Sequence, residues 1–270
     1  MRFKSFISAV LRRFHLLSVA ETIRYRLQKK KFARDNRAFR LQNPTLRLPP
    51  DFFVYETYRL NLKEYYFDGQ ATAKEILHLM QQHRDLLKPG IRILDWGCGP
   101  ARIVRHLPIL LPLAEIYATD YNEKYIDWCQ RELNDIKFSV NQIDPPINYS
   151  DSFFDAIIGV SIFTHLSRAR HISWINELYR IIKPAGIIFI TTQGMAFRSK
   201  LTAPEQSQFD KGYLVTRRYI KEGNRLFSTV QPPEFMKRLL AGRFEIVDFF
   251  PGIKNDYEPV QDNWVLQKSG

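Results

Sequence analysis

The sequence is poor in cysteine, and this scarcity excludes two kinds of protein. Its 270 residues contain only two cysteines, Cys98 and Cys129. Two cysteines cannot build a disulfide framework, which favours a reducing compartment such as the cytoplasm. No C-x-x-C pair and no cluster of cysteine and histidine has the spacing of a zinc site, so we expect no bound metal.

Long apolar runs are also missing. No stretch of about 18 apolar residues occurs, so we expect no transmembrane helix. Arg12 and Arg13 interrupt the apolar stretch near the N-terminus, which makes a poor secretory signal. We find no internal repeat. With 45% hydrophobic residues, the composition is that of a globular protein with one sizeable core.

Acidic residues are scarce at the N-terminus. Residues 1–50 hold 13 Lys or Arg and 2 Asp or Glu. The remaining 220 residues hold 27 Lys or Arg and 26 Asp or Glu. The net charge of +12 therefore belongs almost wholly to an N-terminal arm, which favours a membrane surface or a polyanion as its partner. Apolar residues at helical spacing predict an amphipathic helix over 3–28. With the basic residues up to 31, this helix has two readings: peripheral contact with a membrane, or packing on the domain or on another copy.

The chain divides into an arm, residues 1–68, and a main domain, residues 69–270. We expect residues 34–68 to be irregular because Pro44 and Pro49-Pro50 break helices. From residue 91 onward, short apolar runs alternate with helical stretches, which predicts a doubly wound α/β fold. The polar stretch 193–230 lacks clear periodicity and is interpreted as an insertion that caps the substrate site. The predicted strands are 91–94, 116–119, 136–140, 155–160, 187–192, 244–250 and 263–266, and the predicted helices are 71–83, 101–111, 123–133, 168–182 and 233–240; a short hairpin is predicted near 213–220.

The strongest motif is the loop that follows the first strand. Residues 95–99 read Asp-Trp-Gly-Cys-Gly, and a helix is expected after them. Glycines let a ligand approach the backbone where a Cβ would clash. A dinucleotide loop needs a small third residue, but Arg102 stands there, and Asp95 would repel a pyrophosphate. Asp95 suits a cationic ligand such as an α-amino group, and we interpret Cys98 as a small residue required by sterics.

A second acid follows the next strand. Asp120 follows the run 116–119, 25 positions after Asp95, and Tyr121 comes directly after it. The two oxygens of a carboxylate can accept both hydroxyl groups of a ribose. We therefore place Asp120 and Tyr121 in the same ligand site as the glycine loop.

These motifs resemble those of class I S-adenosylmethionine-dependent methyltransferases, whose first motif is D-x-G-x-G. Residues 151–155 resemble the S-F-D motif of that family, and residues 178–186 resemble L-x-R-x-L-K-P-G-G, with Ala185 in place of a glycine. The resemblance covers about residues 91–192 and looks nearest to bacterial enzymes that modify small metabolites or glycans. It implies a Rossmann-like, mostly parallel sheet of seven strands, the last one antiparallel, with S-adenosylmethionine as cofactor.

The resemblance also assigns roles to two later loops. The loop after the third strand holds adenine in the family, and here Asn141 or Gln142 would supply the polar contact and Ile143 the apolar cover. The loop after the fourth strand faces the methyl group. His165 in this loop titrates near neutral pH and is the candidate general base, while Ser161 contacts cofactor or backbone.

The predicted activity is methyl transfer to a small-molecule or glycan acceptor, at oxygen. An RNA methyltransferase is the first alternative because the isoelectric point is about 9.7. The domain after residue 50 is almost neutral, however, which argues against nucleic acid. A non-catalytic scaffold of the same fold at a membrane surface is the second alternative. The sequence does not indicate an oligomeric state.

Overall fold

The computed structural model describes residues 17–217, 222–223, 227–255 and 259–269. The chain forms two compact units, Met1–Gly69 and Gln70–Gly270, and helix α4 (Leu62–Gln81) crosses the boundary between them. Within the described ranges, none of the helices is both long enough and apolar enough to cross a bilayer.

The first unit is more helical than the sequence analysis expected. Helix α2 (Leu17–Gln42) and helix α3 (Asp51–Thr57) precede α4, so the prediction of an irregular segment over 34–68 was wrong. The prolines lie between helices: Pro44 follows α2, and Pro50 is the N-cap of α3. Asn36 of α2 links this helix to the start of α4. Its side-chain Nδ2 donates to the carbonyl of Leu60, and its Oδ1 accepts the backbone N–H of Leu62. Of the predicted amphipathic helix, residues 3–16 lie outside the described residues, and its membrane contact stays a prediction.

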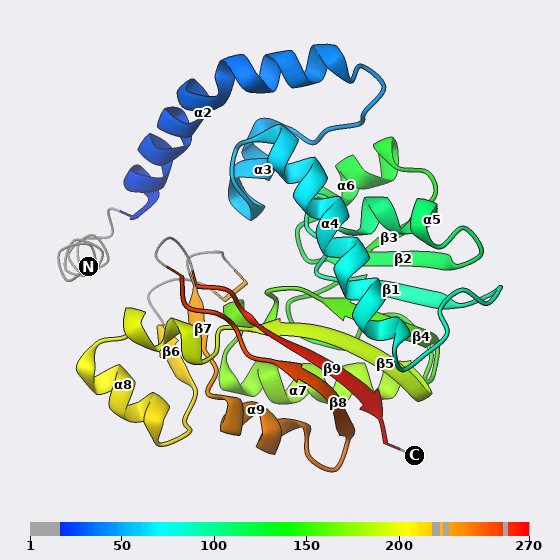
Figure 1. Ribbon diagram of the computed structural model, residues 1–270, viewed down its shortest axis with the longest axis vertical. Helices are drawn as coiled ribbons and strands as arrows, with labels where there is room; N and C mark the ends of the chain where they lie inside the picture. The colour runs from blue at the N-terminus through cyan, green and yellow to red at the C-terminus, as the bar shows by residue number, and fades with distance from the viewer. Residues whose placement is uncertain (1–16, 218–221, 224–226, 256–258, 270) are drawn as a thin grey trace. The chain divides into compact units, whose positions relative to one another are not determined.

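The second unit is built on a seven-stranded sheet with the order β3-β2-β1-β4-β5-β9-β8 (Figure 1). The first five of these strands are parallel, and β9 runs antiparallel to both β5 and β8. The predicted Rossmann-like sheet with an antiparallel last strand is therefore confirmed. The strands are β1 (Arg92–Trp96), β2 (Glu115–Asp120), β3 (Lys137–Val140), β4 (Phe154–Gly159), β5 (Ile182–Thr192), β8 (Phe244–Phe250) and β9 (Asp262–Lys268).

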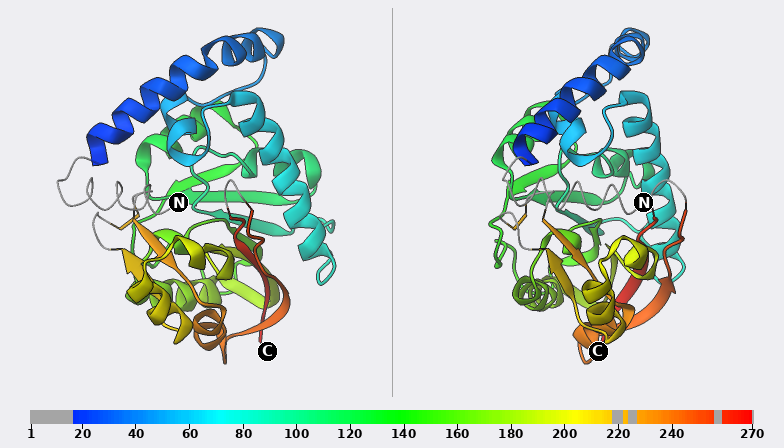
Figure 2. Two further views of the ribbon diagram at one scale, coloured as in Figure 1. Left: turned by 60° about the vertical axis from the view of Figure 1, so that its left-hand side comes forward. Right: turned by 90° about the vertical axis from the view of Figure 1, so that its left-hand side faces the viewer.

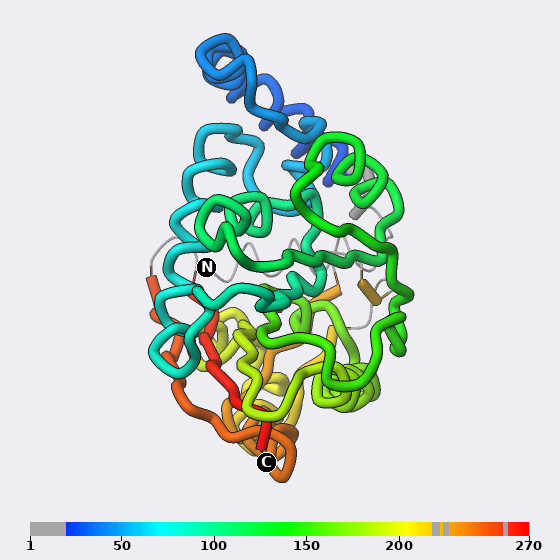
Figure 3. The backbone as a smooth tube through the Cα atoms, turned by 90° about the vertical axis from the view of Figure 1, so that its right-hand side faces the viewer, coloured from blue at the N-terminus to red at the C-terminus, as the bar shows by residue number. Residues whose placement is uncertain are grey.

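Helices α7 (Arg168–Ile181) and α9 (Pro233–Leu240) bury their apolar stripes in one cluster of buried core residues. Trp174 and Leu178 of α7 meet Trp96 of β1 in this cluster, and the rings of Trp96 and Trp174 are 4.7 Å apart. Figure 3 shows β9 beside β5, although some 70 residues separate them in sequence. Helix α6 (Glu123–Glu132) packs near β2 and β3.

In the second unit, one predicted helix and the predicted hairpin differ from the structure. The helix expected over 101–111 is reduced to a 3-10 turn, Val104–His106, and the short helix α5, Leu107–Leu110. Ala101 has a φ of 63°, which ends helical geometry at that residue, and Pro108 occupies a first-turn position of α5, where proline is tolerated. In the insertion, β6 (Val215–Arg217) pairs with β7 (Ser228–Val230), so the strand partner lies beyond the predicted hairpin. Figure 2 shows this small sheet with α8 (Ala203–Asp210).

Asp155 of the S-F-D motif links neighbouring strands of the sheet. The Asp155 carboxylate accepts from the Arg84 guanidinium at 2.7 Å, from the backbone N–H of Arg92 at 3.0 Å and from Lys183 Nζ at 2.6 Å. These bonds outweigh burial and lower the pKa of Asp155. The motif residue is therefore structural and joins β4 to the starts of β1 and β5.

The antiparallel end of the sheet gives a stability prediction. Trp264 on β9 is fully buried, its ring lies 4.1 Å from that of Phe249, and its Nε1 donates to Thr192. We expect Trp264→Ala to lower the free energy of unfolding by about 3–5 kcal/mol because it leaves a cavity. Urea unfolding measures this loss. Ile253→Ala, at a side chain that is 69% exposed, is the control, and an equal loss in both variants would contradict the packing.

Candidate cofactor and active site

The glycine loop is tied to the carboxyl end of β2. The backbone N–H groups of Gly97 and Cys98 both donate to the carbonyl of Thr119, at 2.8 and 2.9 Å. The N–H of Gly99 donates to Asp120 Oδ2 at 2.9 Å. Both glycines have positive φ, 76° at Gly97 and 54° at Gly99, a conformation that side chains rarely adopt. The loop therefore needs its glycines and places Asp120 directly beside them.

Gly97 also allows a close approach. A Cβ at this position would lie 2.1 Å from Cδ1 of Ile162, which follows β4. The Ile162 side chain thus covers the glycine loop, and both residues line one small cavity of about 70 Å³.

This cavity collects most of the predicted site residues. It is lined by Gly97, Asp120, Tyr121, Asn141, Gln142, Ile143 and His165, together with five residues that the sequence analysis did not select: Trp96, Ile162, Leu166, Trp174 and Gly223. Trp96 lies inside the glycine-loop motif and Ile162 follows the predicted strand 155–160, but no sequence pattern marks their side chains as lining. Gly223 belongs to the insertion, where no sequence signal identified it.

Four predicted residues lie outside the lining. Asp95 is buried, and the backbone N–H of Val104 donates to its carboxylate. Cys98 is a buried thiol that donates to the carbonyl of Gly99, in keeping with a steric role. Gly99 acts through its bond to Asp120. Ser161 points to other partners: its N–H donates to Thr191 and its hydroxyl to Gln261 Oε1.

Asp95 and Asp120 form a buried acidic pair. Burial, and then the charge of Asp120, raise the pKa of Asp95 to about 7. Burial raises the pKa of Asp120 to about 6, although the backbone N–H groups of Asn122 and Gly99 oppose the shift. Two carboxylates that are hard to ionise side by side favour a ligand that carries positive charge.

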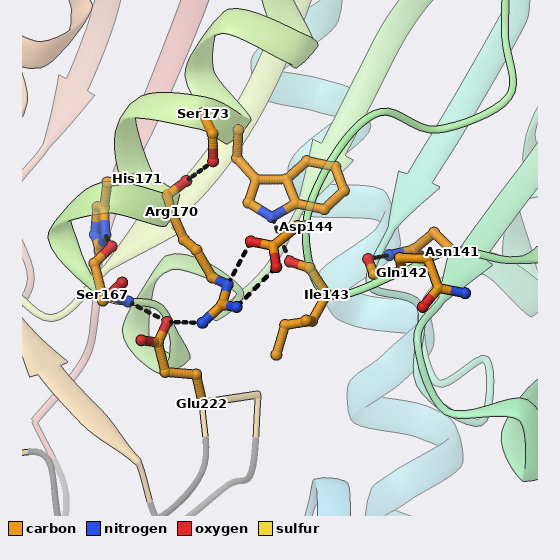
Figure 4. A network of polar contacts seen from close by, with 10 residues as sticks. Asn141, Gln142, Ile143, Asp144, Ser167, Arg170, His171, Ser173 and Glu222 are labelled. Carbon is orange, nitrogen blue, oxygen red and sulfur yellow. Dashed lines mark hydrogen bonds and ion pairs between the residues drawn. The ribbon is translucent and has the colours of Figure 1, made fainter.

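The loop after β3 is held by side chains of helix α7. Trp174 Nε1 donates to the carbonyl of Ile143 at 3.0 Å. The guanidinium of Arg170 binds both oxygens of Asp144, at 2.7 and 2.8 Å, and also reaches Glu222 at 2.7 Å (Figure 4). These contacts fix the backbone on which Asn141, Gln142 and Ile143 stand.

His165 reaches the cavity from the 3-10 turn after β4, Phe163–His165. Its Nδ1 lies 2.8 Å from the carbonyl of Phe227, so this nitrogen carries the hydrogen and Nε2 is the basic nitrogen of the neutral ring. Burial lowers the pKa of His165 below its ordinary value of 6.5. The imidazole is therefore neutral at pH 7 and able to accept a proton. No group of three or more His, Cys, Asp or Glu side chains suited to a metal ion occurs in the described part of the chain.

The buried acidic pair predicts a pH dependence of stability. The pKa of Asp95 is about 7 in the folded chain and 3.8 as its ordinary value. Between these values the folded state binds more protons than the unfolded state, so the free energy of unfolding falls as the pH rises from about 4 to about 7. We expect Asp95→Asn to weaken this fall when urea unfolding is compared at about pH 5 and about pH 8. Asp135→Asn, at an exposed loop position, is the control; an unchanged pH dependence in Asp95→Asn would refute the assignment.

The comparisons with known proteins agree with this geometry. Residues 93–186 match the family described as "Methyltransferase domain". The chain is 29% identical over 187 residues to malonyl-[acyl-carrier protein] O-methyltransferase of Bacillus cytotoxicus, covering 64% of this chain and 61% of the relative. It is 27% identical over 180 residues to the tRNA N(3)-methylcytidine methyltransferase trm140 of Schizosaccharomyces pombe, covering 62% of this chain and 57% of the relative. The chain thus spans about three-fifths of the length of these curated relatives.

Solved structures agree on the fold. A SAM-dependent methyltransferase from Methanosarcina mazei superposes with a TM-score of 0.53 at 20% identity. The match covers 72% of this chain and 96% of the Methanosarcina chain. The magnesium protoporphyrin IX methyltransferase of Synechocystis, solved with bound SAH, superposes with a TM-score of 0.52 at 14% identity and covers 76% and 86%. These structures show the fold alone; together with the family match, the strand order and the glycine loop, they identify residues 93–186 as a class I S-adenosylmethionine-dependent methyltransferase domain.

Proposed function

We propose that the whole protein transfers the methyl group of S-adenosylmethionine to an oxygen atom of a small-molecule or glycan acceptor, with His165 as general base. The observation that carries this proposal is the position of the His165 ring. It lines the same cavity as Gly97, Asp120 and Asn141, and its hydrogen-bonded tautomer leaves Nε2 basic. The relative named as an O-methyltransferase supports oxygen as the acceptor atom.

The acidic end of the sheet fits the cofactor. S-adenosylmethionine supplies a methyl group that its sulfonium charge already activates, so the protein mainly has to bind and orient the reactants. Asp95 and Asp120 would offset the positive charges of the sulfonium and the amino group. Each oxygen of Asp120 accepts one backbone N–H, from Gly99 or Asn122, which leaves lone pairs for two ribose hydroxyls.

Asn141 is the better candidate for the adenine amino group. Its side chain is buried, and its Oδ1 has no hydrogen-bond partner among the described residues, while its Nδ2 donates to the carbonyl of Gln142. A buried acceptor without a partner carries a desolvation cost that a ligand N–H would remove. Gln142 is exposed, and Ile143 would cover the ring.

The insertion 193–230 would cap the acceptor side of the site. Its β7 packs against the 3-10 turn of His165, and the Phe227 carbonyl just before β7 holds the His165 ring. An acceptor hydroxyl bound against this turn would pass its proton to His165 Nε2, and S-adenosylmethionine held at the glycine loop would supply the methyl group and leave as S-adenosylhomocysteine. The insertion would thus both orient the base and exclude water.

RNA is the second candidate acceptor, because one curated relative is named as a tRNA methyltransferase. Against it, Lys and Arg exceed Asp and Glu by only 1 after residue 50. Radiolabelled S-adenosylmethionine and fractionated cell extract separate the two: we expect label in metabolites or glycans, whereas label confined to RNA would favour the alternative.

The glycine loop offers a matched pair of substitutions. Gly97 and Gly90 have nearly the same φ, 76° and 74°, but a Cβ at Gly90 would meet nothing within 4 Å. We expect each change to alanine to cost about 1–2 kcal/mol of stability through the backbone. Only Gly97→Ala should also push Ile162 into the cavity and weaken the affinity for S-adenosylmethionine, about tenfold or more by calorimetry. Equal affinities of the two variants would argue against a cofactor at this loop.

His165 gives the direct test of the proposed base. We expect His165→Ala to keep its affinity for S-adenosylmethionine and to slow transfer to the labelled acceptor fraction about 10²-fold, the usual scale of general-base loss. His78→Ala, at an exposed histidine of α4, is the control for both measurements. Unchanged transfer by His165→Ala would remove His165 from the mechanism.

A further inference from the structure

A second, larger cavity lies apart from the cofactor site. It is a groove of about 800 Å³ between α7, α8, β6 and α9, and it shares no lining residue with the small cavity at the glycine loop. Its volume is in the usual range of small-molecule sites, about 300–1,000 Å³.

Three arginines line this groove. Arg168 comes from the first turn of α7, Arg238 from α9, and Arg243 from the residues just after α9. Over the described ranges, none of the three pairs with a carboxylate, and no Asp or Glu lines the groove.

The absence of acidic partners contrasts with four other arginines of this unit. Arg170, Arg180, Arg198 and Arg217 each form an ion pair at 2.8 Å or less with an Asp or Glu side chain. Three positive charges in one groove repel one another, and an anion bound between them would remove this repulsion. The charge pattern therefore favours a ligand that supplies several anionic oxygens.

Arg238 is oriented by the loop opposite it. Its Nη2 donates to the carbonyl of Gly212. Gly212 has a φ of 76°, and a Cβ there would lie 3.3 Å from this nitrogen, so glycine lets the guanidinium approach the backbone closely. The bond fixes one edge of the planar group, and the remaining N–H donors stay available for an anion.

The groove also has apolar walls. Phe235 and Leu214 are buried beneath it, while Ile172 and Tyr213 keep 43% and 60% of their surface exposed. An exposed aromatic ring beside guanidinium groups offers a surface on which the body of a ligand can stack.

We propose that this groove binds an organic monophosphate whose body carries a ring or another apolar group. A phosphate monoester has nearly two negative charges and three acceptor oxygens, enough for three guanidinium groups, whereas a carboxylate matches only one in a bidentate pair. The proposal does not depend on the proposed methyl transfer, and its test uses binding alone.

The probe is phenyl phosphate, titrated by calorimetry into the full chain at about 150 mM salt. We expect binding that falls at least tenfold in Arg243→Gln and in Arg168→Gln, because each removes one charge and neither side chain makes a hydrogen bond within the described structure. Phenol should not bind, and inorganic phosphate should bind more weakly than phenyl phosphate. Thermal unfolding of each variant checks that the chain is folded.

Lys237→Gln is the matched control, since Lys237 is an exposed cation of α9 that does not line the groove and pairs with Glu234. Displacement of phenyl phosphate by vesicles containing phosphatidic acid would assign the ligand to a lipid headgroup, and no displacement to a soluble phosphate; both support the phosphate chemistry. Failure of phenyl phosphate to bind, or an equal loss in Lys237→Gln, would overturn the proposal.

Discussion

Three hydrogen bonds from backbone N–H groups of the glycine loop to the end of β2 are the constraint on which the rest of the site depends. The N–H groups of Gly97 and Cys98 share the carbonyl of Thr119, and that of Gly99 binds the Asp120 carboxylate. These bonds force positive φ at two glycines, bring the loop within reach of Ile162, and bury Asp120 near Asp95. The cavity, the acidic pair and the cover of the loop all follow from this single attachment.

The polar groups buried at this site lower the stability of the folded state. Two carboxylates are buried close enough for one to raise the pKa of the other, and Asn141 Oδ1 is buried without a partner among the described residues. Folding alone would favour apolar or paired groups at these positions. The same features suit a ligand with positive charge and an N–H donor. The loss of folded-state stability is therefore consistent with a site shaped for binding.

The sequence predicted the sheet well because its signals are local. Each strand is a short apolar run, and the motif acids and glycines stand where strands end, so the edge that collects Gly97 and Asp120 could be inferred. The helices of the first unit were missed because prolines were taken to mark an irregular stretch, whereas Pro50 begins a helix. Gly223 and the Phe227 carbonyl could not be predicted, since their contacts with Tyr121 and His165 depend on the path of a long insertion.

The most direct measurement is a crystal structure of the full chain grown with S-adenosylhomocysteine, the demethylated cofactor. We expect the ribose hydroxyls at the Asp120 carboxylate, the adenine between Ile143 and Asn141, and the sulfur on the side of the cavity that His165 lines. Density for the nucleoside at another edge of the sheet, or a crevice that stays closed over Gly97 at saturating ligand, would contradict this expectation.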